Sequence, residues 1–359
     1  YRIICDDKAG SKDDKLVKNN AAPVKKKIAV IGVTESVGRE ILAFLADGGY
    51  RPSDTAALET KVPLGTQVSF GEEEDIDVGN LEDFDFAEAE IAIFAASEEI
   101  SRRYAAKAAA KGCKVIDCSG AFFADAEVPM IVAGVNDDRL SAAAKNIVGV
   151  PSAAVAQILL PLKAADEAYG IKRLIVSTYT STSVYGKEGM DELFNQTRKI
   201  FMNESLADNQ KVFEKQIAFN VIPQVEEFIG EETRLEWQIN AETKKVLGRD
   251  VKVHANCAFI PAFIGNAVYV NAECEKEVDV DEVRKLMKQT EGVIVFDKNV
   301  KGGYVTLNDV QGEIEVYVSR LRQDASVENG FSFWSAADNL RFGVAGNAYK
   351  IMRKWLGMS

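Results

Sequence analysis

Histidine and cysteine are both scarce in this chain of 359 residues. His254 is the only histidine, which excludes a metal site built from several imidazoles. The five cysteines are odd in number, lie far apart and form no C-x-x-C motif: Cys5, Cys113, Cys118, Cys257 and Cys274. They fit free thiols better than a disulfide framework or a zinc site. We therefore expect no metal, and a reducing compartment that is either the cytoplasm or the interior of an organelle.

The chain also lacks long apolar runs and positive charge. No stretch approaches the roughly 18 consecutive apolar residues that a membrane span requires. The formal net charge is -12 with a pI of about 4.9, and the only basic run, Lys25 to Lys27, is three residues long. Such a surface repels phosphate backbones and anionic lipid headgroups. We expect a soluble protein that neither binds nucleic acid nor inserts into a membrane.

The composition is globular, and the length usually divides into two domains. Residues 1–23 are polar and predict an extension outside the core. In segment 25–33 a short run of lysines is followed by a β-branched apolar run, and helical spacing continues over 37–46, which predicts a strand and a helix. The pattern repeats as strand, helix and strand over 90–96, 101–112 and 114–120. This alternation predicts a doubly wound α/β domain.

The pattern changes from about residue 154. A helix, a strand and a helix are followed by strands of alternating polarity, which predicts an α+β arrangement with a mostly antiparallel sheet. In the last segment, 335–356, apolar residues recur every three or four positions. This spacing predicts one long amphipathic helix.

Six phrases stand out along the chain between about Lys26 and the C-terminus. They read IAVIGVTESVGREIL, VIDCSGAFFADAEVPMIVAGVN, YGIKRLIVSTYTSTSVYGKEGMDEL, AFNVIPQ, EWQINAETKKVLG and WSAADNLRFGVAGNA. Together and in this order they resemble the aspartate-semialdehyde dehydrogenase family. That family carries out a phosphate-dependent hydride transfer between NADP and an aspartyl phosphate/semialdehyde pair.

The resemblance implies two domains and a dimer. Residues 24–153 with 338–359 would form a Rossmann-like doubly wound parallel sheet, and 154–337 an α+β catalytic and dimerisation domain. We expect a homodimer through this second domain. The alternation of acidic and apolar residues over 313–318 would supply an apolar face for the twin subunit, because monomers rarely expose large apolar patches.

The family's chemistry needs a thiolate nucleophile, a histidine base and cations for the substrate's carboxylate and phosphate. Matched to the family's phrases, the positions of its nucleophile, glutamine, substrate arginine and histidine hold Ala153, Thr180, Phe259 and Asn266. The phosphate-binding arginine position holds Phe123; of the substrate Glu/Lys pair Glu236 remains, with Gln238 at the lysine. The resemblance thus predicts a degenerate active site in which none of these residues is catalytic.

The cofactor loop departs in the same direction. It retains Gly32, Thr34 and Gly38, but Glu35 stands where the family has a central glycine, and a second loop contributes Glu98 and Glu99. A carboxylate about 4 Å from a phosphate charge costs roughly 4 kcal/mol at an effective dielectric of 20. We therefore expect no cofactor, or at most weak NADP binding. The simpler interpretation of Glu35 is that it caps the helix and occupies the anion site itself.

Three functions follow from this pattern. The favoured one is a non-catalytic homologue that serves as a structural, scaffolding or regulatory subunit and contacts a further protein partner through the extension and the closed-off cleft. The second is an oxidoreductase with altered chemistry, supported by the retained Glu236, Asn339 and Arg341. The third is a ligand-binding module that uses the old cleft.

Overall fold

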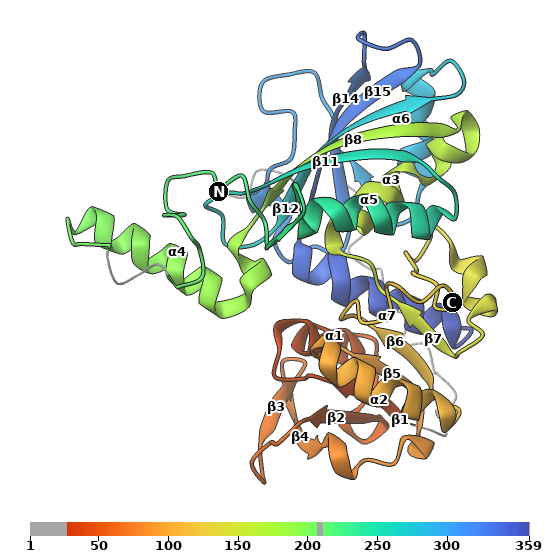
Figure 1. Cartoon of the computed structure of the whole chain (residues 1–359), viewed down its shortest axis with the longest axis vertical. Coiled ribbons are helices and arrows are strands. Elements are labelled where there is room, and N and C mark those ends of the chain that lie inside the picture. The colour runs from red at the N-terminus through yellow and green to blue at the C-terminus, as the bar shows by residue number, and fades with distance from the viewer. Residues whose placement is uncertain (1–26, 207–210, 359) are drawn as a thin grey trace, which may run out of the picture.

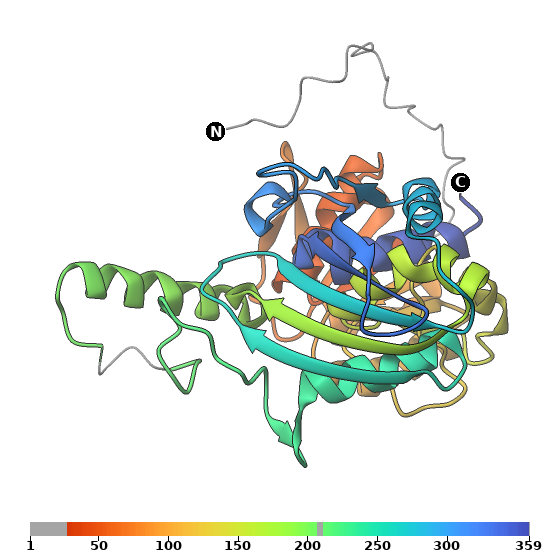
Figure 2. The ribbon, with the colours of Figure 1, turned by 90° about the horizontal axis from the view of Figure 1, so that it is seen from above.

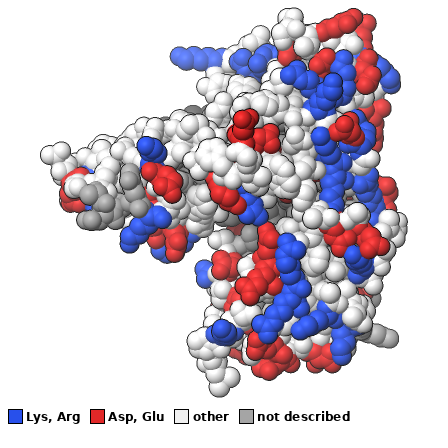
Figure 3. Space-filling view, in the orientation of Figure 1, with Lys and Arg blue, Asp and Glu red and all other residues white. Residues whose placement is uncertain are grey.

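The structure is a computed structural model that describes residues 27–206 and 211–358. The extension predicted over 1–23 lies outside these residues. Figure 1 shows two domains, one above the other, with the chain crossing from the lower to the upper and returning at its C-terminal end. On the face shown in Figure 3, acidic and basic side chains are interspersed over both domains.

The first domain is built on a seven-stranded sheet of order β3-β4-β2-β1-β5-β6-β7, parallel except for the β3–β4 pair. Its strands are β1 (Lys27–Ile31), β2 (Thr55–Glu59), β3 (Gln67–Phe70), β4 (Glu74–Asn80), β5 (Ala89–Phe94), β6 (Lys114–Asp117) and β7 (Ile147–Gly149). Its helices are α1 (Ser36–Asp47) and α2 (Glu98–Ala110), joined by the C-terminal α7 (Gly346–Trp355). Short 3₁₀ helices connect these elements: η1 (Pro52–Asp54), η2 (Leu81–Asp83), η3 (Phe86–Glu88) and η4 (Asp137–Ala142).

Strand β1 shows why this sheet reads as a continuous apolar run. Successive side chains of a strand point to opposite faces. Ile28 and Val30 pack with α1 and α7 on one face, whereas Ala29 and Ile31 pack with α2 on the other. All four are fully buried. Helices therefore cover both faces, as expected for a parallel sheet.

The second domain contains a six-stranded sheet of order β11-β8-β12-β15-β14-β13. Its strands are β8 (Ile171–Thr180), β11 (Lys252–Phe259), β12 (Asn266–Cys274), β13 (Val293–Val295), β14 (Val316–Gln323) and β15 (Gly330–Ala337). The central pairs are antiparallel, whereas β11 runs parallel to β8 and β13 parallel to β14. One face packs on α3 (Ala153–Tyr169), α5 (Arg234–Leu247) and α6 (Val280–Gln289).

The other elements of this domain are smaller or project from it. They are the hairpin β9 (Phe228–Ile229) and β10 (Glu232–Thr233), the 3₁₀ helices η5 (Thr182–Tyr185) and η6 (Leu307–Asp309), and α4 (Gly186–Phe201). Figure 2 shows α4 extending away from the body of the molecule. Within the part of the chain that the structure describes, no helix is long and apolar enough to cross a membrane.

The long helix predicted over 335–356 was placed too early. Ser335, Ala336 and Ala337 belong to β15, where they pair with the first residues of β12. Asp338 then accepts hydrogen bonds from the amides of the next turn and begins the π-helix η7 (Asn339–Ala345), which leads into α7. The error arose because small residues fit a helix or a buried strand equally well, and only the pairing partner distinguishes them.

Most of the apolar side chains in the alternation over 313–318 are covered by the domain itself. Val316 and Val318 are fully buried in the domain's own core, and Ile314 is the one large apolar residue of the segment that is exposed. Exposed large apolar side chains instead gather on α4 and the segment that follows it: Phe194, Phe201, Met202, Phe219, Val221, Phe228 and Ile229. The exposed apolar surface of the second domain therefore lies on α4 and the segment that follows it more than on the alternating strand.

Candidate functional site

A cavity of about 580 Å³ lies between the two domains. The first domain contributes the N-terminus of α1 and the loops after β5 and β6. The second contributes the N-terminus of α3, the end of β8, the start of β12 and the first turn of α5. In open α/β sheets ligands bind at the carboxyl ends of the strands, so this is where the fold places a dinucleotide and its substrate.

Three of the substituted catalytic positions meet in this cavity. Ala153, the first residue of α3, lines it together with Thr180 at the end of β8 and Asn266 at the start of β12. Thr180 and Asn266 are a cross-strand pair. The Asn266 side-chain oxygen accepts a long hydrogen bond from the Ser181 amide at 3.4 Å. The sequence motifs thus converge in space, with a methyl group where a nucleophile would stand.

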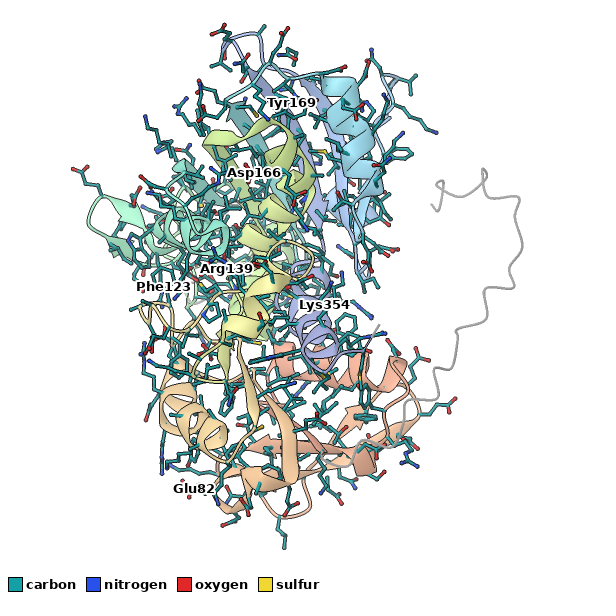
Figure 4. The ribbon with its side chains drawn as sticks, turned by 90° about the vertical axis from the view of Figure 1, so that its right-hand side faces the viewer. Glu82, Phe123, Arg139, Asp166, Tyr169 and Lys354 are labelled. Atoms are coloured by element: carbon teal, nitrogen blue, oxygen red, sulfur yellow. The ribbon has the colours of Figure 1, made fainter. Side chains whose placement is uncertain are left out.

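The substituted arginine positions have become packing sites. Phe259 is 2% exposed, and its ring lies 5.3 Å from that of Tyr185 and 5.1 Å from that of Phe213. Phe123 lies where the two domains meet (Figure 4), against the edge of Trp237 at 5.1 Å. These aromatic contacts fill the space that a charged side chain would need. Of the substrate-binding positions, Gln238 lines the cavity.

The retained polar residues have structural partners. Glu236 accepts hydrogen bonds from the amides of Thr233 at 2.8 Å and Cys257 at 2.9 Å. The Asn339 side-chain oxygen accepts from the Gly265 amide at 2.8 Å. Arg341 lies 3.6 Å from a carboxylate oxygen of Asp47 and stacks over Phe44, so its charge is directed toward α1. The support that these residues lent to altered chemistry is thereby weakened.

Thiols offer no ready replacement for the nucleophile. Among the described cysteines, Cys118 is the one that lines the cavity. Burial, with the charge of neighbouring Asp117, raises the pKa of this thiol well above its usual range. Burial likewise raises the pKa of Cys257 to about 12. Because the thiolate is the reactive form, both thiols are poor nucleophiles near neutral pH.

Glu242 is a residue of the site region that the motif comparison missed. Burial raises its pKa to about 7, and its carboxylate accepts a 2.9 Å hydrogen bond from the amide of Ser152, which precedes Ala153 at the cavity wall. A signal was present in the sequence: Glu242 falls on the buried stripe of α5, between Ile239 and Val246. An acidic residue at an apolar position of an amphipathic helix indicates a buried carboxyl group.

The dinucleotide loop keeps the shape that a phosphate needs. A Cβ at Gly32 would lie 2.5 Å from the Ala95 carbonyl oxygen, and one at Gly38 would lie 2.1 Å from that of Gly32, so both positions need glycine. The first hydrogen bond within α1 runs from the Arg39 amide to the Glu35 carbonyl. The amides of the first turn therefore stay open toward the cavity. The residues present therefore fit a pyrophosphate.

The acidic residues near this loop are less obstructive than their charges suggested. Glu35 is exposed and its side chain makes no capping hydrogen bond, so it does not occupy the anion site as a cap. Glu98 pairs with Arg102 at 3.0 Å and, across the domain boundary, with Arg234 at 2.8 Å. Glu35 lines the cavity but is free to turn into solvent. Glu98 is paired with two guanidinium groups, of which that of Arg234 is shared with Glu227.

Glu59, at the end of β2, is a second residue that the motif comparison did not single out. Its carboxylate oxygen Oε2 accepts a 2.7 Å hydrogen bond from the Thr34 hydroxyl. The other oxygen, Oε1, accepts from the Thr60 amide at 3.0 Å. An acidic residue at the end of the second strand of a Rossmann-like unit is a pattern that could have been noticed in the sequence. In the described part of the chain, no group of three or more His, Cys, Asp or Glu residues is placed to hold a metal ion.

Comparison with known proteins covers both domains. Residues 27–143 match the family model for the semialdehyde dehydrogenase NAD binding domain, and residues 159–342 match that for the semialdehyde dehydrogenase dimerisation domain. Aspartate-semialdehyde dehydrogenases of Rickettsia bellii and Aquifex aeolicus are 37% and 34% identical, over 91% and 90% of this chain and 96% of each relative. The crystal structure of aspartate semialdehyde dehydrogenase II from Vibrio cholerae has a TM-score of 0.88 at 32% identity, and the match covers 93% of this chain and 99% of that one.

These matches correct the expectation that no cofactor is bound. That prediction was wrong, because residues 27–143 match a NAD binding domain and the relatives are dehydrogenases. The electrostatic argument had treated Glu35 and Glu98 as fixed, uncompensated charges. An exposed carboxylate in bulk water interacts with a phosphate charge by only about 1 kcal/mol at 4 Å. The match of 159–342 to a dimerisation domain supports the homodimer.

Proposed function

This chain belongs to the aspartate-semialdehyde dehydrogenase family, and from that premise we propose that it is a non-catalytic member that acts as a structural or regulatory subunit. The observation that carries the proposal is the methyl group of Ala153 at the N-terminus of α3, facing the cavity between the domains. A covalent acyl intermediate requires a nucleophile there and a base within hydrogen-bond reach. Neither Ala153 nor the neighbouring Asn266 amide meets that requirement.

The proposed role includes binding of a dinucleotide. When bound, its nicotinamide ring is a group that accepts or donates a hydride. The chain's own contribution would be to hold it: Gly32 and Gly38 would let the backbone approach the pyrophosphate, and the first-turn amides of α1 would donate hydrogen bonds to it. Without a nucleophile in the cavity, binding would link the two domains that line it rather than serve turnover.

The exposed aromatic surface of α4 and the segment after it supports a role in assembly. Phe201 is 79% and Phe219 62% exposed, and their rings stack edge to face at 5.7 Å. Such residues are rarely left in water together on a monomer. We propose that this surface belongs to the homodimer and that a further protein contacts the assembly.

A ligand-binding role for the cavity is the second candidate, favoured by Glu226. This residue lines the cavity with a left-handed backbone, φ 65°, and burial raises its pKa. Its Oε2 atom is buried without a hydrogen bond, with the nearest charge on Arg234 at 3.9 Å. Strain and an unsatisfied polar atom concentrate at functional positions. A small molecule that donates a hydrogen bond to Glu226 would complete this site.

An activity assay tests the main proposal. Purified full-length protein is incubated with aspartate semialdehyde, phosphate and either NAD or NADP, and absorbance of the reduced dinucleotide is followed. We expect no rate above the control without protein, and no rescue by Ala153→Cys alone, because the base position still holds Asn266. Turnover proportional to protein concentration would refute the non-catalytic role. Rescue by the single change would show that the base position had been assigned wrongly.

A further inference from the structure

We propose that Glu59 makes this chain select NAD over NADP. The inference rests on the dinucleotide site of the proposed function and is independent of whether the protein catalyses a reaction. A dinucleotide differs between its two forms only at the 2′-position of the adenosine ribose, which is a hydroxyl in NAD and a phosphate in NADP. At the end of β2, Glu59 is the residue that would meet the 2′-position.

The backbone places Glu59 beside the phosphate loop. Strands β1 and β2 are parallel, with Ile31 opposite Leu58, and the Gly32 amide donates a 3.0 Å hydrogen bond to the Leu58 carbonyl. Because the carboxyl ends of parallel strands meet at one edge, Glu59 lies next to the turn that leads into α1. Figure 1 shows β1 and β2 as neighbours in the lower domain. In Rossmann-like units this is where an acidic residue binds the ribose.

Local hydrogen bonds hold the Glu59 carboxylate in that place. Thr34, within the loop itself, donates to Oε2 through its hydroxyl at 2.7 Å and its amide at 3.4 Å. The Thr60 amide donates to Oε1 at 3.0 Å. An ionised carboxylate offers about four acceptor sites, so one remains for a ribose hydroxyl. Thr34 therefore orients the group while leaving it able to accept from the ligand.

The same carboxylate opposes a 2′-phosphate. Glu59 is half-buried, so its charge is less screened than that of the exposed Glu35. The basic residues nearest to it along the chain and on α1 are Lys61 and Arg39, both of them exposed. A phosphate would have to recruit these two side chains from solvent while standing against a fixed negative charge. A ribose hydroxyl meets no such opposition and gains a charge-assisted hydrogen bond.

Calorimetry with the full-length protein tests the selectivity directly. We expect NAD to bind at least about tenfold more tightly than NADP at low salt, with the ratio falling as ionic strength rises. Glu59→Gln keeps the shape and one acceptor but removes the charge, and should bring the ratio close to one, chiefly by improving NADP. The control is Glu88→Gln, which changes an exposed carboxylate of the same domain. Glu88 directly precedes β5 and so lies at the amino ends of the parallel strands, away from the carboxyl end of β2. This variant should keep the wild-type ratio.

A second measurement does not depend on any variant. In the wild-type protein, ADP-ribose should compete with NAD, whereas the same compound bearing a 2′-phosphate should compete at least about tenfold less well. Equal or tighter binding of NADP by the wild-type protein, or an unchanged ratio in Glu59→Gln, would overturn the proposal. Failure of both dinucleotides to bind would overturn it as well. Turnover in the activity assay would refute only the non-catalytic role and leave this selectivity standing.

Discussion

Neutralising Glu242 should remove a large part of the pH dependence of stability. Its side chain is 4% exposed, and burial raises its pKa to about 7, whereas a glutamate in an unfolded chain titrates near 4.3. Between these two values the folded protein holds a proton that the unfolded chain has lost. The contribution of Glu242 to the free energy of unfolding must therefore fall as pH rises from about 4.3 to about 7.

The size of the effect follows from the two pKa values. They differ by between two and three pH units, and each unit corresponds to about 1.4 kcal/mol, so the loss is roughly 3 to 4 kcal/mol above pH 7. The amide of Ser152 partly offsets the cost by donating to the ionised carboxylate at 2.9 Å. A glutamine can accept the same hydrogen bond without the charge. Glu242→Gln should thus be more stable than the wild type at pH 8 and lose that advantage near pH 4.5.

Urea unfolding at intervals from pH 4.5 to 8.5, read by tryptophan fluorescence, measures this difference. Other buried carboxyl groups whose pKa is raised, such as Asp117, contribute equally to both proteins, so the difference between them isolates Glu242. Glu99→Gln, which changes an exposed carboxylate, is the matched control and should follow the wild-type curve. Parallel curves for Glu242→Gln and the wild type would show that the group is ionised in the folded protein at little cost.

Three further predictions concern packing, the phosphate loop and the cavity thiol. Phe259→Ala should lower the free energy of unfolding by about 3–5 kcal/mol, whereas Leu64→Ala, at a fully exposed position of the first domain, should change it by less than about 0.5; equal losses in chemical denaturation would contradict the packing role. Gly38→Ala should weaken dinucleotide binding by calorimetry, because its Cβ would stand 2.1 Å from the Gly32 carbonyl oxygen; unchanged affinity would show that the loop yields freely. Cys118 should be alkylated far more slowly in the folded than in the urea-unfolded protein at pH 7, measured by peptide mass spectrometry, because burial raises its pKa; rapid labelling would reveal a reactive thiol.

Local patterns in the chain were sufficient to predict the architecture. The apolar run from Lys27 to Ile31 is typical of a strand that is buried on both faces, and α1 follows from apolar residues at helical spacing. The motif phrases also identified Ala153, Thr180 and Asn266, which the fold brings to one cavity. These predictions succeeded because periodicity and short motifs are properties of neighbouring residues.

Only the tertiary structure decided what the charged and small residues do. Glu98 is compensated by Arg234, which is 136 residues away in the chain, and without that contact the dinucleotide site appeared more repulsive than it is. Ser335 to Ala337 form a strand because β12 lies beside them. The position of Glu59 at the end of a strand could be noted in the sequence, but only the fold shows that Thr34 holds its carboxylate against the phosphate loop. The energy of a charge or a backbone amide depends on the partner that the fold brings to it, and a sequence pattern does not specify that partner.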